Sequence, residues 1–515
     1  MSFTVTLLAV VAFVYLAIKQ MSGTDLPKIK GVPEIPGVPI FGSLIQLGKS
    51  HARSCRKLAA KYGPIFQIRL GNRRFIYVNG FEAVKDLWVG QSHALISRPT
   101  TWTWSSVVST TQGTTLATSP WSESIKRVRK AAATALNKKS IDTYLPSVDL
   151  EATIAIKELL EGAKSGDIDP INYFQRLSLN MSLRVNYGFR LKGDIQDQKI
   201  REVIDVEREM GVLRGIANNW QDYIPIMRLW PGYRSHAKSL RERRDAYLME
   251  FHDELLRRID AGTDMPCITG TVIKSPEAKL SPAELKTISM TMVAAGLDTI
   301  PSNINMTIAY LSSPHGQEIQ KRAYDELIKT YPNGDAWHAC TQNETCEYVA
   351  ALVKESLRYF STFNMCIYRQ LVHDIEYKGV KYPEGTPFVM NAYAANHDGS
   401  HFKEPDVYNP ERYIGVPSAG LQQMTYGAGS RMCAGAQLAN QELYTVFTRM
   451  ILAFQIREAS DVTKRPELDP IDCNYLLTGM VTQPWPFEVK LVPRDEKQLN
   501  KWIVESKERT VAFDL

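Results

Sequence analysis

Five long stretches with helical hydrophobic periodicity occupy the middle of the chain and constrain its fold more than any other feature. They lie near residues 147–164, 196–216, 235–260, 282–312 and 343–360. Shorter β-rich segments flank them, with a hairpin predicted over residues 65–78 and further strands over 370–391. A last apolar helix is expected over about 436–454. The pattern predicts one large, mainly α domain with a small β-sheet at one side.

The composition is that of an ordinary globular protein and excludes several classes. The 515 residues are 44% hydrophobic and 23% charged, so the chain is neither disordered nor fibrous. A net charge of +6 is small for this length and gives no support to nucleic-acid binding. The seven cysteines form no C-x-x-C pair and have no clustered histidines for zinc. A disulfide framework is not expected, which suits the reducing cytosol.

The N-terminus predicts a membrane anchor followed by a hinge. Residues 3–18 carry no charge and end at Lys19, a run slightly shorter than the roughly 20 residues of a bilayer span. Only two residues precede the run, which disfavours a signal peptide with a basic leader. We therefore expect an anchor over residues 1–20, a proline-rich hinge over 21–40 and a single domain over 41–515. Lysines after the run place this domain in the cytosol by the positive-inside tendency.

The strongest chemical signal is the glycine-rich loop Tyr426–Gly435, YGAGSRMCAG, which delivers Cys433 to the start of an apolar helix. A helix N-terminus and nearby backbone N–H groups favour negative sulfur, so we expect a lowered thiol pKa. Gly435 leaves room for a flat ligand against the backbone. A lone cysteine in a tight turn is commonly buried and inert. The spacing of the surrounding residues must therefore decide between an inert thiol and a thiolate that binds a ligand.

A second signal interrupts the apolar helix over residues 282–312. Gly296, Asp298 and Thr299 stand among side chains that are too apolar to face water. Glycine lowers helix stability, so close approach of another group to the backbone is expected there. Pro301 cannot donate a hydrogen bond one turn back, which predicts a distorted helix beside Thr299. A simple kink, with the acid paired to a neighbour, is the plainer alternative.

The cysteine loop resembles F-x-x-G-x-R-x-C-x-G, the haem-binding signature of the cytochrome P450 superfamily. It agrees at Gly429, Arg431, Cys433 and Gly435 and departs conservatively at Tyr426. The resemblance covers nearly the whole chain. It implies the cytochrome P450 fold, with haem b between the oxygen-binding helix and the cysteine-loop helix, and with Cys433 as the iron ligand.

The resemblance also implies roles for other motifs. Glu355, Arg358 and Arg412 match the structural triad of the family, although each alone is an ordinary surface charge. Asp298 and Thr299 match the acid and the alcohol that relay protons to the haem site. The expected haem-binding residues are Trp121, Lys126, Arg127, Arg98, Gly296, Arg369, Gly429, Arg431 and Gly435.

The basic run that follows Trp121 leaves one haem contact open. In the family, a basic residue four positions after this tryptophan binds a propionate, but Ile125 stands there. Lys126 and Arg127 therefore remain alternatives. The family docks an acidic electron donor on the same surface, so we expect the run 126–130 to face NADPH–cytochrome P450 reductase.

The implied reaction is monooxygenation, which uses O2 and two electrons from NADPH. The segments GVPEIPGVPIFG and AGLDT and the cysteine loop are similar to the fungal phenylacetate hydroxylase branch, which implies ring hydroxylation of phenylacetate or a hydroxyphenylacetate. Arg208 or Arg214 could supply charge for such an acid. The alternatives are oxidation of a larger aromatic intermediate in fungal secondary metabolism, a rearrangement without O2, and a haem sensor. The anchor predicts the endoplasmic reticulum membrane.

Overall fold

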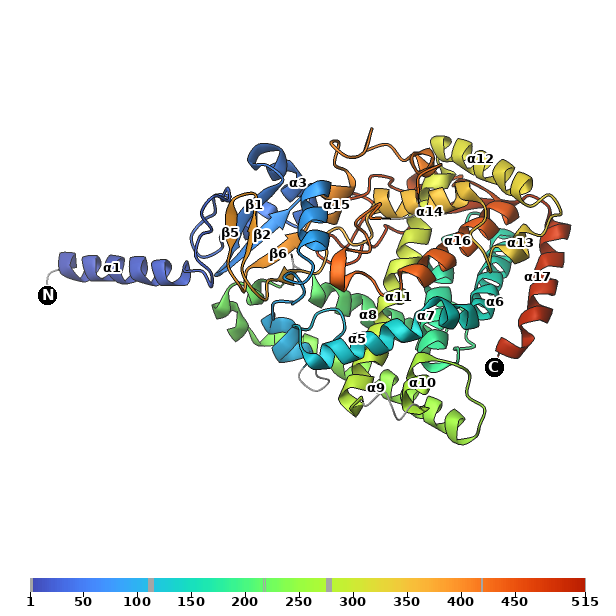
Figure 1. The fold of residues 1–515 in the computed structure, drawn as a ribbon, viewed down its shortest axis with the longest axis horizontal. Coiled ribbons are helices and arrows are strands. Elements are labelled where there is room, and N and C mark those ends of the chain that lie inside the picture. Colours follow the sequence, from blue (N-terminus) through green and yellow to red (C-terminus); the bar gives the residue numbers. More distant parts are fainter. Residues whose placement is uncertain are drawn as a thin grey trace.

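Helices form most of the protein, and a small sheet lies toward the end from which the N-terminal helix projects (Figure 1). The computed structural model describes residues 3–109, 115–215, 217, 219–274, 280–417 and 420–514. In chain order, the α-helices are α1 (Phe3–Met21), α2 (Leu44–Leu47), α3 (His51–Tyr62), α4 (Phe81–Val84), α5 (Glu123–Ala135), α6 (Lys138–Ala163), α7 (Ile171–Tyr187), α8 (Gln198–Arg214), α9 (Pro231–Asp260), α10 (Ile268–Lys274), α11 (Pro282–Ser312), α12 (Pro314–Thr330), α13 (Ala336–Ala339), α14 (Glu347–Phe360), α15 (Ala392–Asn396), α16 (Ala436–Ala453) and α17 (Glu496–Thr510). The predicted mainly α architecture is confirmed.

The strands form one four-stranded sheet and two separate pairs. They are β1 (Ile65–Leu70), β2 (Arg73–Val78), β3 (Arg369–Gln370), β4 (Ile375–Tyr377), β5 (Val380–Tyr382), β6 (Pro387–Met390), β7 (Phe454–Glu458) and β8 (Val489–Pro493). The main sheet has the order β1-β2-β6-β3, in which β2 and β6 run parallel and the other pairs antiparallel. The hairpin predicted over residues 65–78 and the strands predicted over 370–391 are confirmed.

The proline-rich segment after α1 packs on the main sheet instead of standing free. Ile29, Val32 and Ile35 are buried between its prolines. The side chain of Gln67 in β1 donates hydrogen bonds to the carbonyls of Ile29 and Val32, at 2.8 Å and 2.7 Å, and accepts one from the Ile29 N–H. The folded body therefore begins near Ile29, earlier than the predicted start near residue 40, because the apolar residues of this segment join the core.

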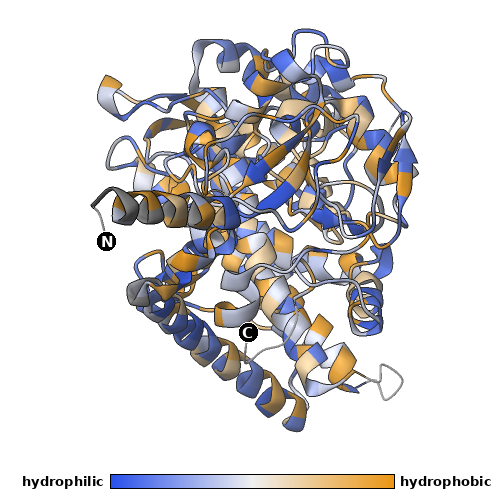
Figure 2. Cartoon of the chain, turned by 90° about the vertical axis from the view of Figure 1, so that its left-hand side faces the viewer, coloured by the Kyte–Doolittle hydropathy of each residue, from blue (hydrophilic) through white to orange (hydrophobic). Residues whose placement is uncertain are grey.

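The helix α1 lies apart from the body (Figures 1 and 2). Several of its apolar side chains are exposed, among them Leu8 and Phe13. Within the residues that the structure describes, no helix meets the length and apolar character needed to cross a membrane. The membrane anchor predicted for residues 1–20 is therefore not supported as a spanning segment.

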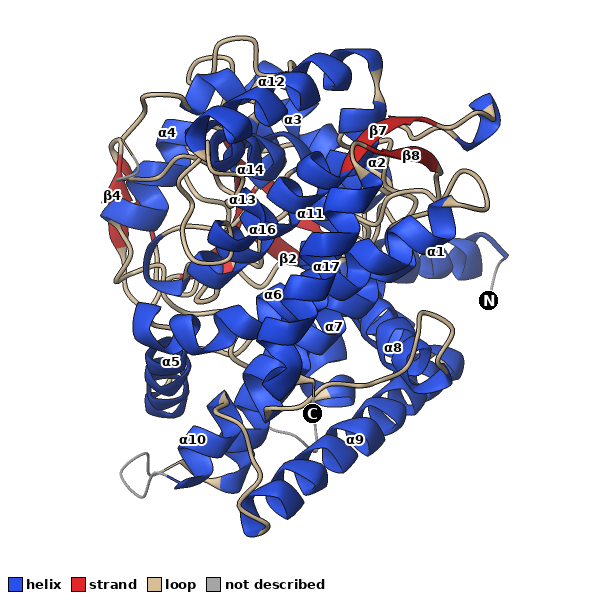
Figure 3. Ribbon diagram, turned by 90° about the vertical axis from the view of Figure 1, so that its right-hand side faces the viewer, coloured by secondary structure: helices blue, strands red, loops and turns tan. Residues whose placement is uncertain are grey.

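The long helix α11 runs through the middle of the molecule (Figures 1 and 3). A capping box starts it: the Ser281 hydroxyl accepts a hydrogen bond from the Glu284 N–H, and the Glu284 carboxylate accepts one from the Ser281 N–H. The helix continues through Pro301, so the distortion predicted beside Thr299 does not interrupt it. Because Pro301 has no backbone N–H, the carbonyl of Leu297 lacks its usual hydrogen-bond donor in the helix.

The predicted triad of charged residues is brought together behind the cysteine loop. Glu355 accepts hydrogen bonds from Arg358 Nε and Nη2, both at 2.8 Å, and neither side chain is exposed to solvent. Arg412 Nε lies 3.1 Å from Glu355 Oε2. Arg358 also donates to the carbonyls of Asn396 and Pro405, at 2.8 Å each. These contacts join α14 to the segment before the cysteine loop.

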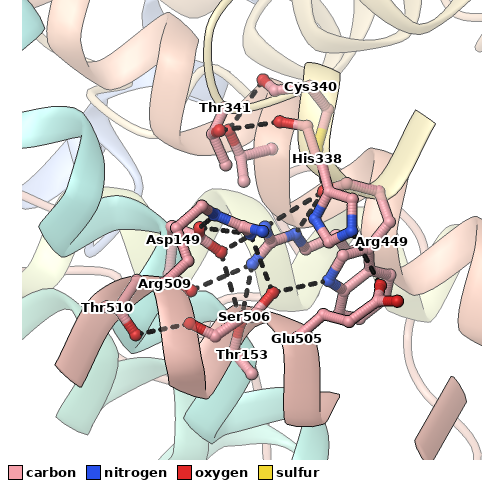
Figure 4. Close-up of polar contacts among 12 residues, drawn as sticks. Asp149, Thr153, His338, Cys340, Thr341, Arg449, Glu505, Ser506, Arg509 and Thr510 are labelled. Carbon is pink, nitrogen blue, oxygen red and sulfur yellow. Dashed lines mark hydrogen bonds and ion pairs between the residues drawn. The ribbon is translucent and has the colours of Figure 1, made fainter. Parts of the chain in front are cut away.

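A second buried network ties α17 to the body around Asp149 of α6 (Figure 4). Asp149 Oδ1 accepts a hydrogen bond from Arg449 Nη2 at 2.5 Å, and Oδ2 accepts from Arg509 Nε at 2.8 Å. Trp337 Nε1 donates to the Ser506 hydroxyl at 3.0 Å. The side chains of Asp149 and Arg449 are buried, so each charge depends on the other, and the pair joins α6 to α16. Arg509 adds α17 through its contact with the same carboxylate.

Candidate active site

The cysteine loop has a tight shape that glycine makes possible. Gly429 adopts φ +65°, and a Cβ atom at this position would lie 1.8 Å from the carbonyl oxygen of Trp88. Further along, the Cys433 N–H donates to the carbonyl of Tyr426 at 2.9 Å and closes the loop. Cys433 is thereby fixed three residues before the start of α16.

A cavity of about 350 Å³ lies between α11, the cysteine loop and α16. Gly296, Asp298 and Thr299 line it from α11, and Cys433 and Gly435 line it from the loop. The structure therefore brings together the two motifs that lie more than a hundred residues apart in the sequence. Gly429 does not line the cavity, because its role is to let the loop pass Trp88.

The glycine of α11 is explained by helix packing. A Cβ atom at Gly296 would lie 2.8 Å from the Ser182 hydroxyl of α7, so a larger residue would push the two helices apart. This close approach is the one expected from the sequence, and its partner is a neighbouring helix. It leaves the adjoining face of α11, with the exposed Ala295 and the half-buried Thr299, open to the cavity.

Cys433 is solvent-accessible and lines the cavity. Burial raises its pKa, while the N–H of Gly435 and the charge of Arg129 oppose that rise. The expectation of a lowered thiol pKa is therefore wrong for the protein alone, because desolvation outweighs the helix N-terminus. A thiolate here requires a further positive charge at the sulfur, such as a ligated metal ion.

Three buried arginines meet at one end of the cavity. Arg98, Arg369 and Arg431 donate hydrogen bonds to backbone carbonyls, for example to those of Tyr368, Ala428 and Leu116. In the part of the chain that the structure describes, none of the three forms an ion pair with a carboxylate, and the Nε atoms of Arg98 and Arg431 have no hydrogen-bond partner.

The electrostatics of this arginine cluster favour an anionic ligand. Burial lowers the pKa of Arg369 to about 10 and that of Arg431 to about 9, with nearby arginines adding to the effect. Burial and the other two arginines hold the pKa of Arg98 well below its usual range. Buried cations are normally paired, so the cluster fits a ligand that carries carboxylate groups.

The helix α5 presents a different cation to the cavity from those predicted. Arg127 pairs with Glu284 at 2.6 Å, Lys126 lies 3.6 Å from Glu123, and neither lines the cavity. Trp121 does not line it either. Arg129 does, and its Nη2 donates to the Ser430 carbonyl at 3.3 Å. The sequence alone did not reveal this role, because the inward face of α5 is set by the burial of Ile125, one turn before Arg129.

The acid and the alcohol of α11 are both in place. Asp298 is 7% exposed, and its Oδ1 atom has no hydrogen-bond partner among the described residues. Burial raises the pKa of Asp298 to about 6, and Glu207 adds to this, while Arg208 and Arg214 act in the opposite direction. The Thr299 hydroxyl donates to the carbonyl of Ala295 at 2.8 Å. A carboxyl group with such a pKa can give and take protons near neutral pH.

Comparison with known proteins identifies the family. Residues 32–491 match the family model described as Cytochrome P450. The chain belongs to this family. The P450 is 52% identical over 507 residues to the phenylacetate 2-hydroxylase of Emericella nidulans, with 98% of both chains covered. It is 38% identical over 495 residues to the 3-hydroxyphenylacetate 6-hydroxylase of the same organism, covering 95% of this chain and 94% of the relative.

A solved zebrafish cytochrome P450 structure with abiraterone has the same fold. It superposes with a TM-score of 0.69 at 20% identity, covering 86% of this P450 and 100% of that chain. The predicted fold class is confirmed by this likeness and by the family match. The protein is a haem-thiolate monooxygenase with haem b as cofactor, and like other P450 monooxygenases it uses O2 and a redox partner.

The residues around the cavity fit haem. Cys433 would hold the iron, and the arginine cluster of Arg98, Arg369 and Arg431 would hold the two propionates, with Arg129 beside them. In the described part of the chain, no group of three or more His, Cys, Asp or Glu side chains could hold a bare metal ion. Haem bound through a thiolate supplies the O2 activation that monooxygenation requires.

Five segments that are distant in the sequence contribute to the wall of the cavity. Residues from 100–118, 205–230, the α11 segment, 362–367 and 476–481 each contribute to its wall. Residues 110–114 of the first segment lie outside the described residues. These segments contribute both apolar and polar side chains to the cavity wall.

Proposed function

We propose that this P450 hydroxylates phenylacetate, or a hydroxyphenylacetate, on the aromatic ring. The observation that carries the proposal is the similarity to the phenylacetate 2-hydroxylase, which extends over nearly the full length of both chains. The second relative is named for ring position 6. Positions 2 and 6 both adjoin the ring carbon that bears the acetate group, so we infer attack at that position.

The test is turnover by the purified holoenzyme with reductase and NADPH. Phenylacetate, 3-hydroxyphenylacetate and their methyl esters are supplied separately, and products are identified by mass and retention time. We expect 2-hydroxyphenylacetate from phenylacetate and preference for the free acids over the esters. If the enzyme converts none of the four compounds but accepts larger aromatic compounds, it would be assigned to secondary metabolism instead.

We further propose that NADPH–cytochrome P450 reductase is the electron donor and that it docks over α5 and the start of α6. Lys126, Lys130, Lys138 and Lys139 are exposed there and outnumber the nearby acids. Arg129, which points to the cavity wall, lies beneath this surface. Positive charges on one surface steer an acidic partner toward the haem side of the enzyme.

We also propose that residues 1–20 hold the enzyme at the endoplasmic reticulum membrane, with the catalytic domain in the cytosol. Supporting this, Ile226, Leu229 and Trp230 form an exposed apolar segment. This segment follows Tyr223, whose carbonyl accepts a hydrogen bond from Asn72 N, and the carbonyl of Asn72 accepts one from Asp25 N shortly after α1. These hydrogen bonds connect the exposed apolar segment to the place where α1 joins the body.

The membrane proposal is tested by fractionation. Deletion of residues 1–20 should move the protein from the membrane fraction toward the supernatant without loss of haem, and replacement of Leu229 and Trp230 by serine should weaken the remaining association. Secretion of the full-length protein with glycans on the body would contradict the proposed location.

A further inference from the structure

We propose that Arg214 binds the carboxylate of the aromatic acid and so selects acids over neutral compounds of the same shape. The inference rests on the proposed function. Arg214 is the last residue of α8 and lines the main cavity together with Trp104 and Asp298. It also lines a smaller cavity of about 70 Å³, which shares Arg98, Trp104 and Met480 with the main one. Arg214 therefore stands where the two cavities adjoin.

The guanidinium of Arg214 has donors to spare. Its nearest acid is Glu207, whose Oε2 lies 3.7 Å from Arg214 Nη2, beyond hydrogen-bond distance. Its carbon Cζ lies 4.7 Å from the centre of the Trp104 ring. Among the described residues, its side chain forms no hydrogen bond, although it is only 14% exposed. A largely buried guanidinium with a loose partner can accept a planar carboxylate in bidentate geometry.

The competing acid is already engaged elsewhere. Glu207 Oε1 accepts a hydrogen bond from the Tyr247 hydroxyl at 2.7 Å. A second buried cation, Arg244, acts on Arg214, and Arg244 itself pairs with Asp245 at 3.3 Å. Asp298 acts on Arg214 from α11, and burial raises the pKa of Asp298 to about 6. Because Tyr247 already uses one oxygen of Glu207 and the other lies 3.7 Å from Arg214, the N–H donors of Arg214 remain available to the carboxylate of an aromatic acid.

The other cations of the cavity are positioned for a different task. Arg98, Arg369 and Arg431 act on one another at the end that fits the haem propionates, whereas Arg214 acts on Asp298. Arg208, the other arginine considered from the sequence, pairs with Asp205 at 2.9 Å and does not line the cavity. The Trp104 ring beside Arg214 supplies an apolar surface for the aromatic ring of the same ligand.

The experiment compares phenylacetate with phenylacetamide, a neutral compound of nearly the same shape. Equilibrium dialysis gives the dissociation constant of each for the holoenzyme, and steady-state kinetics separate KM from kcat. We expect Arg214→Gln to weaken binding of the acid by at least about tenfold and binding of the amide by less than about threefold. Arg214→Lys keeps the positive charge but loses the two parallel N–H donors of the guanidinium, so it should bind the acid more tightly than Arg214→Gln and less tightly than the wild type.

Two further variants keep the test independent of folding. Arg208→Gln removes a cation from the same helix and should leave both dissociation constants unchanged. The double variant Arg214→Gln with Glu207→Gln removes one charge of each sign, so it should retain haem and still lose affinity for the acid.

Two results would overturn the inference while leaving the proposed function intact. One is equal binding of acid and amide by a wild-type enzyme that hydroxylates phenylacetate. The other is undiminished acid binding in haem-loaded Arg214→Gln. A wild-type enzyme that neither binds nor hydroxylates any arylacetic acid would instead refute the proposed function, and the role of Arg214 would fall with it.

Discussion

The Thr299 hydroxyl donates a hydrogen bond to the carbonyl of Ala295, one turn earlier in α11, at 2.8 Å. The hydroxyl is thereby held at the cavity wall, and its oxygen lone pairs remain available to accept a hydrogen bond. Asp298, the adjoining residue, lines the same cavity with a partly unpartnered carboxyl group. We therefore expect the two groups to pass protons into the haem site.

Replacing Thr299 with alanine should therefore uncouple the enzyme without unfolding it. The variant should bind haem and substrate normally, while product formed per NADPH falls by about tenfold or more and hydrogen peroxide rises. The hydrogen bond to Ala295 contributes little to helix stability, so the free energy of unfolding should change by no more than about 0.5 kcal/mol. Thr307→Ala, at another back-bonded threonine of α11 that does not line the cavity, is the control. Tight coupling preserved in Thr299→Ala would remove the catalytic role.

Asp298 should make stability depend on pH. Its pKa is about 6 in the folded protein and near 4 in the unfolded chain, so between these values the folded state binds more protons. The free energy of unfolding should then fall as the pH rises from about 4 to about 6, by at most about 3 kcal/mol, and stay level above. Asp298→Asn should remove this fall. Unfolding of both proteins across pH 4–8 measures it, and parallel curves would show that Asp298 does not titrate in this range.

The Asp149–Arg449 pair should be essential for stability. Asp149→Asn leaves Arg449 charged and buried without its acid, so we expect the free energy of unfolding to fall by about 3–5 kcal/mol. Glu505→Gln, which breaks the partly exposed contact with His338 seen in Figure 4, should cost less than about 1 kcal/mol. Denaturant titration of the holoenzyme gives both values. Equal decreases in the free energy of unfolding of the two variants would show that burial does not determine how much these ion pairs contribute to stability.

Cys433→Ser should abolish thiolate ligation. The carbon monoxide complex of the reduced variant should lose the absorption band of thiolate-ligated haem, because a serine hydroxyl at this position is not an anionic sulfur donor. Cys340→Ser is the matched control, since that thiol is buried beside Trp337 and away from the cavity. An unchanged band in Cys433→Ser would refute the assignment of the iron ligand.

Charge reversal at Lys130 and Lys139 should slow electron transfer from the reductase. At low salt we expect reduction to be several-fold slower than in the wild type, and the difference should shrink as salt screens the charges. Lys321→Glu, on α12, serves as the control. Affinity for substrate should not change, because neither lysine lines the cavity. Equal rates at low salt would place the docking surface elsewhere.

The sequence was sufficient for the features that depend on local pattern. The hairpin over residues 65–78 follows from alternation around a glycine turn, and the cysteine loop follows from its glycine spacing. The basic residues of α5 could not be ranked in this way. Which of them faces inward depends on the rotation of α5, which packing sets through Ile125 and Val128. Arg129 became recognisable only once those two residues were seen to be buried.

Two further differences have the same origin in tertiary structure. The sequence around Cys433 shows the N–H groups that favour a thiolate, but not the desolvation that opposes it. The segment after α1 shows prolines that stiffen a chain, but not Gln67, whose side chain fastens the segment to the sheet. Both effects come from residues that are distant in the sequence or from the body as a whole.

Gly429 and Gly435 belong to the same loop but should differ in mutational tolerance. Any side chain at residue 429 would collide with the backbone of Trp88, a contact that only a rearranged main chain could relieve. A Cβ atom at residue 435 would meet no described atom within 4 Å, so the polypeptide itself would accept alanine there. We therefore expect the fold to require the first glycine and the flat cofactor to require the second. Randomising the codons of these two positions would therefore distinguish the requirement for folding, seen at residue 429, from the requirement for haem binding, seen at residue 435.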